Sequence, residues 1–180
     1  MQSPQNHYNR LSISLHWLTL ALLIAVYALI ELRDLAPKGS ALRDGIQMWH
    51  ETLGLTVFCL FFFRLAVRRT FGIPPITPQP PAWQHTAARA MHWALYLFLI
   101  LTPVLGWITL SAQGKVVPFF GYEWPALMGP DKAWGHDLKE IHETIGNLGY
   151  YLIGLHALAA LYHHYIVGDN TLQRMLPKVR

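Results

Sequence analysis

The sequence predicts an all-α integral membrane protein, a bundle of four transmembrane helices. Three observations support this fold class: an apolar composition, four long apolar runs, and histidines placed inside those runs. Of 180 residues, 53% are hydrophobic and 13% charged, about half the charged share of an ordinary soluble domain. The length suits one domain, so residues 1–180 are expected to form a single membrane domain. The only cysteine, Cys59, excludes a disulfide framework and a four-cysteine metal site.

Four runs are long enough to cross the ~30 Å hydrocarbon core, which takes about 20 apolar residues. The predicted spans cover about 11–32, 45–67, 88–112 and 142–167. The second is the weakest, because its uncharged stretch Thr52–Phe63 reaches span length only if Glu51 and Arg64 are included. We include it because a three-span chain would leave the basic segment after Phe63 on the same side as the acidic segment before it.

The charges sort with these spans. With the N-terminus inside, the inside carries eight Lys and Arg residues against one acid, and the outside carries six against nine acids. The cluster Arg64, Arg68 and Arg69 lies directly at a span end, where the positive-inside rule acts. Both termini are therefore expected to be cytoplasmic. The Pro-rich stretch 73–81 then becomes an inside linker of extended character, and 114–133 becomes an outside loop.

Four of the ten histidines lie inside or at the mouths of spans: His16, His50, His142 and His156. Ionisable residues in a membrane bundle are costly and are read as functional by default; the alternative for any one of them is a hydrogen bond to a neighbouring carbonyl. His142 and His156 are 14 residues apart, which returns to within ~40° of the same helix face after ~21 Å of rise. One face of the fourth span thus carries two histidines at two depths.

A short repeat fixes the depth of two of these histidines. The pentads beginning at His50 and His142 read His-Glu-Thr-Leu-Gly and His-Glu-Thr-Ile-Gly, and their spans run in the same direction. Depth therefore pairs His50 with His142 near the outside, and His16 with His156 near the inside. Two facing imidazoles beside a flat apolar slot suit a six-coordinate b-type haem in a four-helix bundle.

Small residues near these histidines favour the same interpretation, because they let a porphyrin approach the backbone. The glycines concerned are Gly54, Gly146, Gly149 and Gly154. Glycine also serves ordinary helix packing in membranes, so these positions add little on their own.

Four segments closely resemble the bacterial cytochrome b561 family: 10–17, 142–151, 162–165 and 169–177. The resemblance covers roughly Arg10 to Pro177. It implies a multi-pass protein of the bacterial inner membrane with two haems b, one held by His16 and His156 on the cytoplasmic side, the other by His50 and His142 on the periplasmic side. It further implies an enzyme that oxidises superoxide at the periplasmic haem and reduces ubiquinone near the cytoplasmic haem.

Residues for the two substrates are less well defined, and no side chain is singled out as catalytic. Candidates for a quinone site on the inside are His92, His163 and His164, near the aromatic residues Trp17, Trp93, Tyr162 and Tyr165; aromatics at span ends also serve as interfacial anchors. Superoxide would be steered by positive charge. The outside sums to a charge of −3 (6 − 9), so the basic residues Arg33, Lys38, Arg43, Lys115 and Lys132 would have to be gathered by folding.

Two other functions stay open. The chain would also suit an electron-transfer or anchor cytochrome subunit that serves a partner dehydrogenase or another redox protein. From a different class, it would suit a histidine-lined metal transporter or a haem-free structural bundle. The expected partners are superoxide, quinone and membrane lipid, with a homo-oligomer or redox partner left open and no nucleic acid. His85 and His136 are expected to hold no haem.

Overall fold

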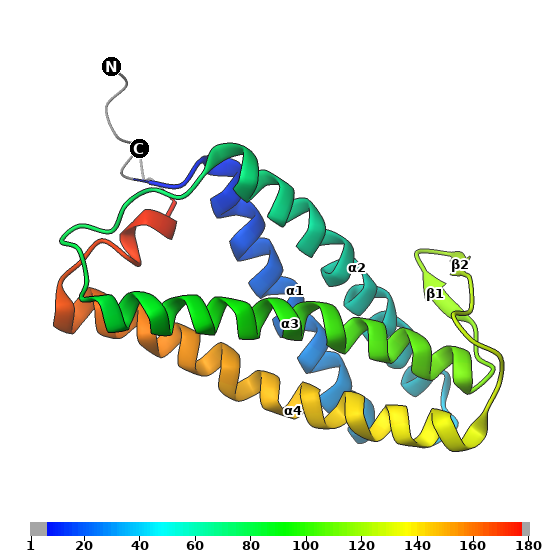
Figure 1. Ribbon diagram of the computed structural model, residues 1–180. Coiled ribbons are helices and arrows are strands. Elements are labelled where there is room, and N and C mark those ends of the chain that lie inside the picture. Colours follow the sequence, from blue (N-terminus) through cyan, green and yellow to red (C-terminus); the bar gives the residue numbers. More distant parts are fainter. Residues whose placement is uncertain (1–6, 178–180) are drawn as a thin grey trace.

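Four long helices run back and forth in two pairs that lie at an angle to one another (Figure 1). The computed structural model describes residues 7–177. The helices are α1 (Arg10–Leu35), α2 (Ala41–Phe71), α3 (Ala82–Ala112) and α4 (Lys132–Tyr162), the last continuing as a π-helical turn over His163–Val167. All four are long and apolar enough to cross a membrane. The predicted four-helix membrane bundle is therefore what the chain forms.

Each helix begins and ends at a residue whose local chemistry explains the boundary. The side chains of Asn9, Ser40 and Asp131 accept hydrogen bonds from backbone N–H groups in the first turns of α1, α2 and α4, as N-caps do. Gly72 and Gly168 adopt positive φ directly after α2 and the π-helical turn, a conformation in which glycine is the favoured residue. The helices α3 and α4 begin six and ten residues before the predicted spans, because their first turns are polar.

Both described ends of the chain lie at the same end of the bundle (Figure 1), where the backbone N–H of Tyr8 donates to the carbonyl of Arg174. We call this the terminal end; it also holds the irregular segment 72–81 between α2 and α3. The opposite end is called the hairpin end. It holds the α1–α2 connection and a two-stranded hairpin within 113–131. The four helices bring both described ends of the chain to one end of the bundle, as four spans predict; the cytoplasmic location of this end stays a prediction.

The hairpin is a feature that the sequence analysis left as a loop. Strands β1 (Val117–Phe119) and β2 (Tyr122–Trp124) pair antiparallel around Phe120 and Gly121. Both turn residues have positive φ, 50° and 84°, as a two-residue type I′ turn requires. The hydroxyl of Thr52 donates to the carbonyl of Pro118 at 3.3 Å. This bond fastens the hairpin to α2 close to His50.

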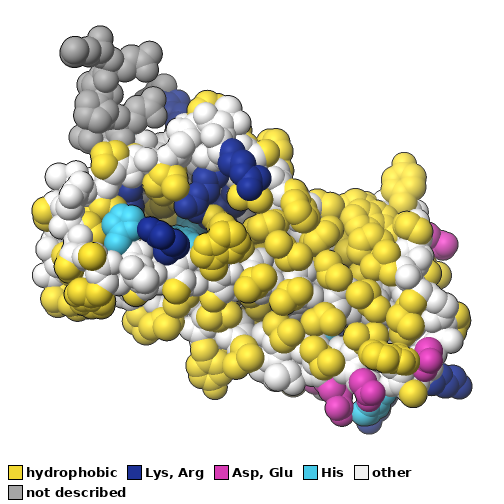
Figure 2. All heavy atoms as spheres, viewed as in Figure 1, with side chains coloured by type: hydrophobic (Ala, Val, Ile, Leu, Met, Phe, Trp, Pro, Cys, Tyr) yellow, Lys and Arg dark blue, Asp and Glu magenta, His cyan; other side chains and the backbone are white. Residues whose placement is uncertain are grey.

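The helices pack as two pairs, α1 on α2 and α3 on α4, with further contacts between α2 and α3. Midway along the bundle, Val57 and Phe61 of α2 pack with Phe98 and Leu99 of α3 in a buried apolar cluster. Outward-facing apolar side chains cover much of the face seen in Figure 2. Such a surface is the one expected against lipid hydrocarbon. Inside the bundle, the buried cluster around Val57 and Phe61 lies between the two ends.

Candidate haem-binding site

The first histidine pair lies at the hairpin end, between α2 and α4. The ring centres of His50 and His142 are 6.3 Å apart, with their planes 86° to one another. The Nδ1 atom of His50 lies 2.9 Å from the carbonyl oxygen of Val26, and that of His142 lies 2.9 Å from the carbonyl of Thr102. A carbonyl only accepts, so each Nδ1 carries the proton and each Nε2 keeps a free lone pair. Both imidazoles are thus held in the tautomer that binds a metal through Nε2.

A glycine that the sequence analysis missed shapes this pair. A Cβ atom added at Gly106 of α3 would lie 3.1 Å from Cε1 and 3.3 Å from Nδ1 of His142, tighter than ordinary van der Waals contact. The missing side chain therefore lets the imidazole lie against the α3 backbone and reach the carbonyl of Thr102. The only signal in the sequence was a glycine three residues after Pro103 in an otherwise apolar run, which hydropathy alone does not separate from a packing glycine.

The second pair lies at the terminal end, between α1 and α4. The ring centres of His16 and His156 are 6.3 Å apart, with an interplanar angle of 61°. A third histidine is close: the ring of His92, on α3, is centred 5.7 Å from that of His156. The Nδ1 of His92 lies 2.7 Å from the carbonyl of Ala88, whereas the Nδ1 of His16 faces Nη2 of Arg64 at 2.6 Å. The structure thus brings two possible partners to His156.

The ring-centre spacing of both pairs fits a bis-histidine iron. A metal bonded to two imidazoles lies about 2 Å from each nitrogen, and each nitrogen lies about 1 Å from its ring centre, which places the two ring centres about 6 Å apart. Cβ atoms added at Gly54 and Gly146 would meet nothing within 4 Å. These glycines lie one helical turn from His50 and His142 and on the same faces. Open space beside the backbone at these positions is what a porphyrin ring needs.

Of the other two glycines singled out in the sequence, one leaves space for a porphyrin and the other serves helix packing. Gly154 also has open space where a Cβ would be, close to His156. Gly149 does not, because a Cβ there would lie 2.2 Å from the hydroxyl of Tyr27 and 2.5 Å from the ring of Phe98. Gly149 is therefore a packing glycine that lets α4 approach α1 and α3. The hydroxyl of Tyr27 donates to the carbonyl of Gly146 at 2.6 Å, one turn away.

The quinone candidates at the terminal end have separate surroundings. His92 lies beside His156, whereas Nδ1 of His163 lies 2.5 Å from Oδ2 of Asp169. The Nδ1 of His164 is buried and has no hydrogen-bond partner among the described residues. Of the aromatic residues, Trp17 packs 5.4 Å from His16 and donates from its indole to the carbonyl of Met175. The side chains of Trp93, Tyr162 and Tyr165 are exposed, as interfacial anchors would be.

Asp169 is the buried acid of this end, 2% exposed. Burial alone would raise the pKa of its carboxyl, but hydrogen bonds from His163 and Thr171 outweigh that effect and lower the pKa. The carboxylate is therefore ionised at neutral pH, and it orients His163 by accepting from Nδ1. The sequence analysis did not single out Asp169, since an acid six residues from a histidine has no helical register that pairs them. The π-helical turn and Gly168 bring them together.

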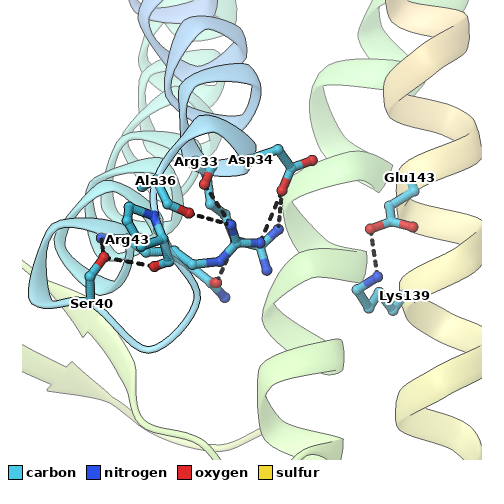
Figure 3. A network of polar contacts seen from close by, with 9 residues as sticks. Arg33, Asp34, Ala36, Ser40, Arg43, Lys139 and Glu143 are labelled. Carbon is cyan, nitrogen blue, oxygen red and sulfur yellow. Dashed lines mark hydrogen bonds and ion pairs between the residues drawn. The ribbon is translucent and has the colours of Figure 1, made fainter.

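Two of the basic residues considered for steering superoxide are engaged locally at the hairpin end (Figure 3). Arg43 donates to the carbonyls of Arg33 and Ala36 at 2.7 and 3.1 Å, and it pairs with Asp34 at 3.0 Å. Arg33 donates to Gln47 at 2.9 Å and lies 3.4 Å from the same carboxylate. Lys38, Lys115 and Lys132 are exposed. The two arginines thus bond to groups at the end of α1, and the three lysines carry the exposed positive charge.

Two further histidines, His85 and His136, lie on the surface. His85 is exposed, and His136 lies within 3.6–3.7 Å of Asp137 and Glu140. Glu51 accepts from Gln47, and Glu143 pairs with Lys139 at 2.7 Å, so neither acid contacts the histidine that precedes it in sequence. Within residues 7–177, no three histidine, cysteine or acidic side chains converge as they would around a bare metal ion.

Comparison with known proteins identifies the family. The prokaryotic cytochrome b561 family matches residues 7–178. "Cytochrome b561 homolog 1" of Escherichia coli (strain K12) is 41% identical over 173 residues, 96% of this chain and 98% of the relative. "Probable superoxide oxidase CybB" of Yersinia pestis is 37% identical over 173 residues, 96% and 97% of the two chains. "Cytochrome b562" of Cereibacter sphaeroides is 29% identical over 175 residues, 94% of each chain. The chain therefore belongs to the prokaryotic cytochrome b561 family, membrane helical bundles that carry b-type haem and transfer electrons.

Proposed function

We propose that the chain binds two haems b, oxidises superoxide at the hairpin end and reduces ubiquinone at the terminal end. The observation that carries this proposal is the presence of two histidine pairs, each with ring centres 6.3 Å apart, at opposite ends of the bundle. Each haem, when bound, accepts and releases one electron at a time. Fourteen residues of α4 separate His142 from His156, about 21 Å of helix. The two sites together extend through most of a membrane's thickness.

In this reaction the polypeptide holds the two haems, keeps water out of the space between them and supplies protons to the quinone. His50 and His142 at one end, and His16 and His156 at the other, supply the axial nitrogens. The apolar cluster around Phe61 and Phe98 keeps water out of the space between the two sites. Two superoxide anions each lose one electron to become two molecules of oxygen, and ubiquinone takes up two electrons and two protons to become ubiquinol.

The protons for ubiquinol are assigned to the terminal end. His163, whose Nδ1 donates to the carboxylate of Asp169, is one candidate for delivering them. His92 and His164 are the other candidates for contact with the quinone headgroup, His164 because its buried Nδ1 lacks a partner among the described residues. No single one of the three is assigned as the catalytic residue.

The orientation follows from charge. The chain is assigned to the bacterial inner membrane with the terminal end in the cytoplasm, because the basic excess lies at that end. Superoxide then arrives from the periplasm, at the hairpin end. A fluorescent protein fused to the C-terminus tests this topology: fluorescence in cells supports it, and a silent, translocated fusion contradicts it.

The substrate is tested with purified protein. Exposure to an enzymatic source of superoxide should reduce the low-spin b-type absorption and, in the presence of ubiquinone, form ubiquinol; added superoxide dismutase should abolish both. Reduction by dithionite but not by superoxide would remove the superoxide assignment. The relatives that carry only cytochrome names make an electron-transfer subunit the second candidate, and stoichiometric copurification of a dehydrogenase would favour it.

A further inference from the structure

Two half-buried arginines at the terminal end have no acidic partner among the described residues. Arg64 and Arg68 lie one turn apart on the same face of α2. The guanidinium of Arg64 contacts Nδ1 of His16, whereas that of Arg68 donates to the hydroxyl of Tyr96 and lies 5.7 Å from the centre of its ring. Among residues 7–177, every ion pair within 4.0 Å involves other residues. Two half-buried positive charges therefore receive no counter-charge from these residues.

The surrounding residues do not supply this counter-charge. Arg174 adds a third guanidinium that is 6% exposed, and it donates to the carbonyl of Pro74. The one carboxylate of this end, Asp169, is occupied by His163 and Thr171. On the face shown in Figure 2, Lys and Arg side chains gather with a histidine around a hollow at the terminal end, whereas the acids lie at the other end. Buried charges in proteins are normally paired, so this group of guanidinium side chains is suited to bind an anion.

The contact between Arg64 and His16 gives a second, independent reason to expect a different partner. A guanidinium has five N–H donors and no acceptor, so Nδ1 of His16 must accept, and the ring proton then lies on Nε2. A histidine that ligates iron through Nε2 needs that atom unprotonated. The observed contact is therefore incompatible with His16 as an Nε2 ligand, unlike the carbonyl contacts of His50 and His142. For His16 to bind a metal, Arg64 must turn to another acceptor.

We propose that Arg64, together with Arg68, binds the propionate carboxylates of the haem held by His16 and His156. This inference rests on the proposed function, since it requires a haem at the terminal end. Haem carries two propionates, and the planar guanidinium fork matches a carboxylate with two parallel hydrogen bonds. When Arg64 turns from His16 to a propionate, its positive charge gains a counter-charge, and Nδ1 of His16 is released at the same time. Arg64 is thus a positioning residue for the cofactor and for its ligand.

The test compares haem with a version that lacks free carboxylates. Full-length protein, stripped of haem, is reconstituted with protohaem or with its dimethyl ester, for the unchanged chain, Arg64→Gln and Arg64→Lys. With protohaem, Arg64→Gln should bind the terminal-end haem at least about tenfold more weakly, the effect of losing a charge-assisted hydrogen bond. It should also lower that haem's midpoint potential, because a positive charge near the iron is lost. Arg64→Lys should recover part of both effects. With the dimethyl ester, the three proteins should bind equally.

Arg69→Gln is the matched control, because Arg69 is exposed on the same helix. It should bind protohaem and the dimethyl ester as the unchanged chain does. An equal loss in Arg64→Gln for protohaem and ester would overturn the proposal and assign Arg64 to His16 alone. An effect that appears only in phosphatidylglycerol vesicles, and not in phosphatidylcholine, would assign the pair to an anionic lipid headgroup and also overturn the proposal. The hairpin-end haem spectrum reports folding. Uptake of a single haem by the unchanged chain would instead refute the two-haem proposal.

Discussion

At the hairpin end, both facing imidazoles hydrogen-bond to backbone carbonyls through Nδ1, whereas at the terminal end His16 faces the guanidinium of Arg64 and a third histidine lies beside the pair. The arginines differ in the same way. Arg33 and Arg43 share Asp34 at the hairpin end, but Arg64 and Arg68 have no carboxylate within ion-pair distance among the described residues. At the hairpin end, contacts within the polypeptide thus leave both Nε2 atoms free to bind a metal. At the terminal end, under our proposal, the propionates of the haem supply the negative charge that Arg64 and Arg68 lack.

The largest expected effect comes from removing a proposed haem ligand at the hairpin end. His142→Ala should lose the hairpin-end haem entirely and keep the other, because no further histidine lies beside His50 to replace the missing ligand. Pyridine haemochrome analysis should then count one haem per chain instead of two. His85→Ala and His136→Ala are the controls, since both side chains are exposed, and each should keep both haems. Retention of two haems by His142→Ala would contradict the assignment of this pair.

The terminal end offers two partners for His156, and their substitution separates them. The ring centres of His16 and His92 lie 6.3 and 5.7 Å from that of His156, both close to the about 6 Å that two metal bonds in line require; the pairing by depth along the spans favours His16. We expect His16→Ala to lose the terminal-end haem, and His92→Ala to keep it while slowing quinone reduction. Haem content and the low-spin electron paramagnetic resonance signal distinguish the two outcomes. The reverse result would make His92 the ligand, consistent with its carbonyl-bound Nδ1.

Much of this comparison could be predicted from the sequence. The four helices follow from apolar runs, and the two histidine pairs follow from the 14-residue spacing on α4 combined with the repeated pentad; the structure brings the paired rings together, while their role as ligands stays a prediction. Helix ends were less predictable, because a span is set by hydropathy and a helix by its caps. Thus α4 begins at Lys132, after the Asp131 cap, although its first ten residues are too polar to count as membrane.

Contacts between helices could not be predicted, because they depend on how each helix is rotated about its axis. The apposition of Gly106 and His142, and that of Arg64 and His16, join residues of different helices with no fixed sequence spacing. The β1–β2 hairpin was missed for a different reason. Its strands are three residues each, and Phe120 adopts a positive φ, a conformation that a bulky residue rarely signals.

A smaller effect on haem binding is expected from filling the space beside His142 at the hairpin end. Gly106→Ala places a Cβ atom 3.1 Å from the His142 ring, which pushes the imidazole away from the carbonyl of Thr102. Overpacking of this kind costs about 1–3 kcal/mol, so retention of the hairpin-end haem should weaken by about tenfold, with a changed midpoint potential. Gly45→Ala is the matched control, because a Cβ there meets nothing within 4 Å. Equal behaviour of the two variants would show that Gly106 does not shape the site.

The smallest effect concerns the carboxylate that the terminal end does possess. Asp169→Asn should lower thermal stability at neutral pH by roughly 1–3 kcal/mol, the cost of weakening a buried hydrogen-bonded charge. The measurement is haem-monitored unfolding in detergent. Asp137→Asn is the control, because Asp137 faces a histidine on the surface at 3.6 Å, and it should change little.

The pH dependence gives this last experiment its sign. Hydrogen bonds from His163 and Thr171 lower the pKa of Asp169, so the stabilising contribution of its carboxylate is complete above the unfolded pKa of about 3.9. It is lost as the pH falls through the lower folded value. The difference between the unchanged chain and Asp169→Asn should therefore be constant from neutral pH down to about 4 and shrink only below that. A difference that vanishes near pH 6 instead would show that the charge of Asp169 does not control the stability of this end.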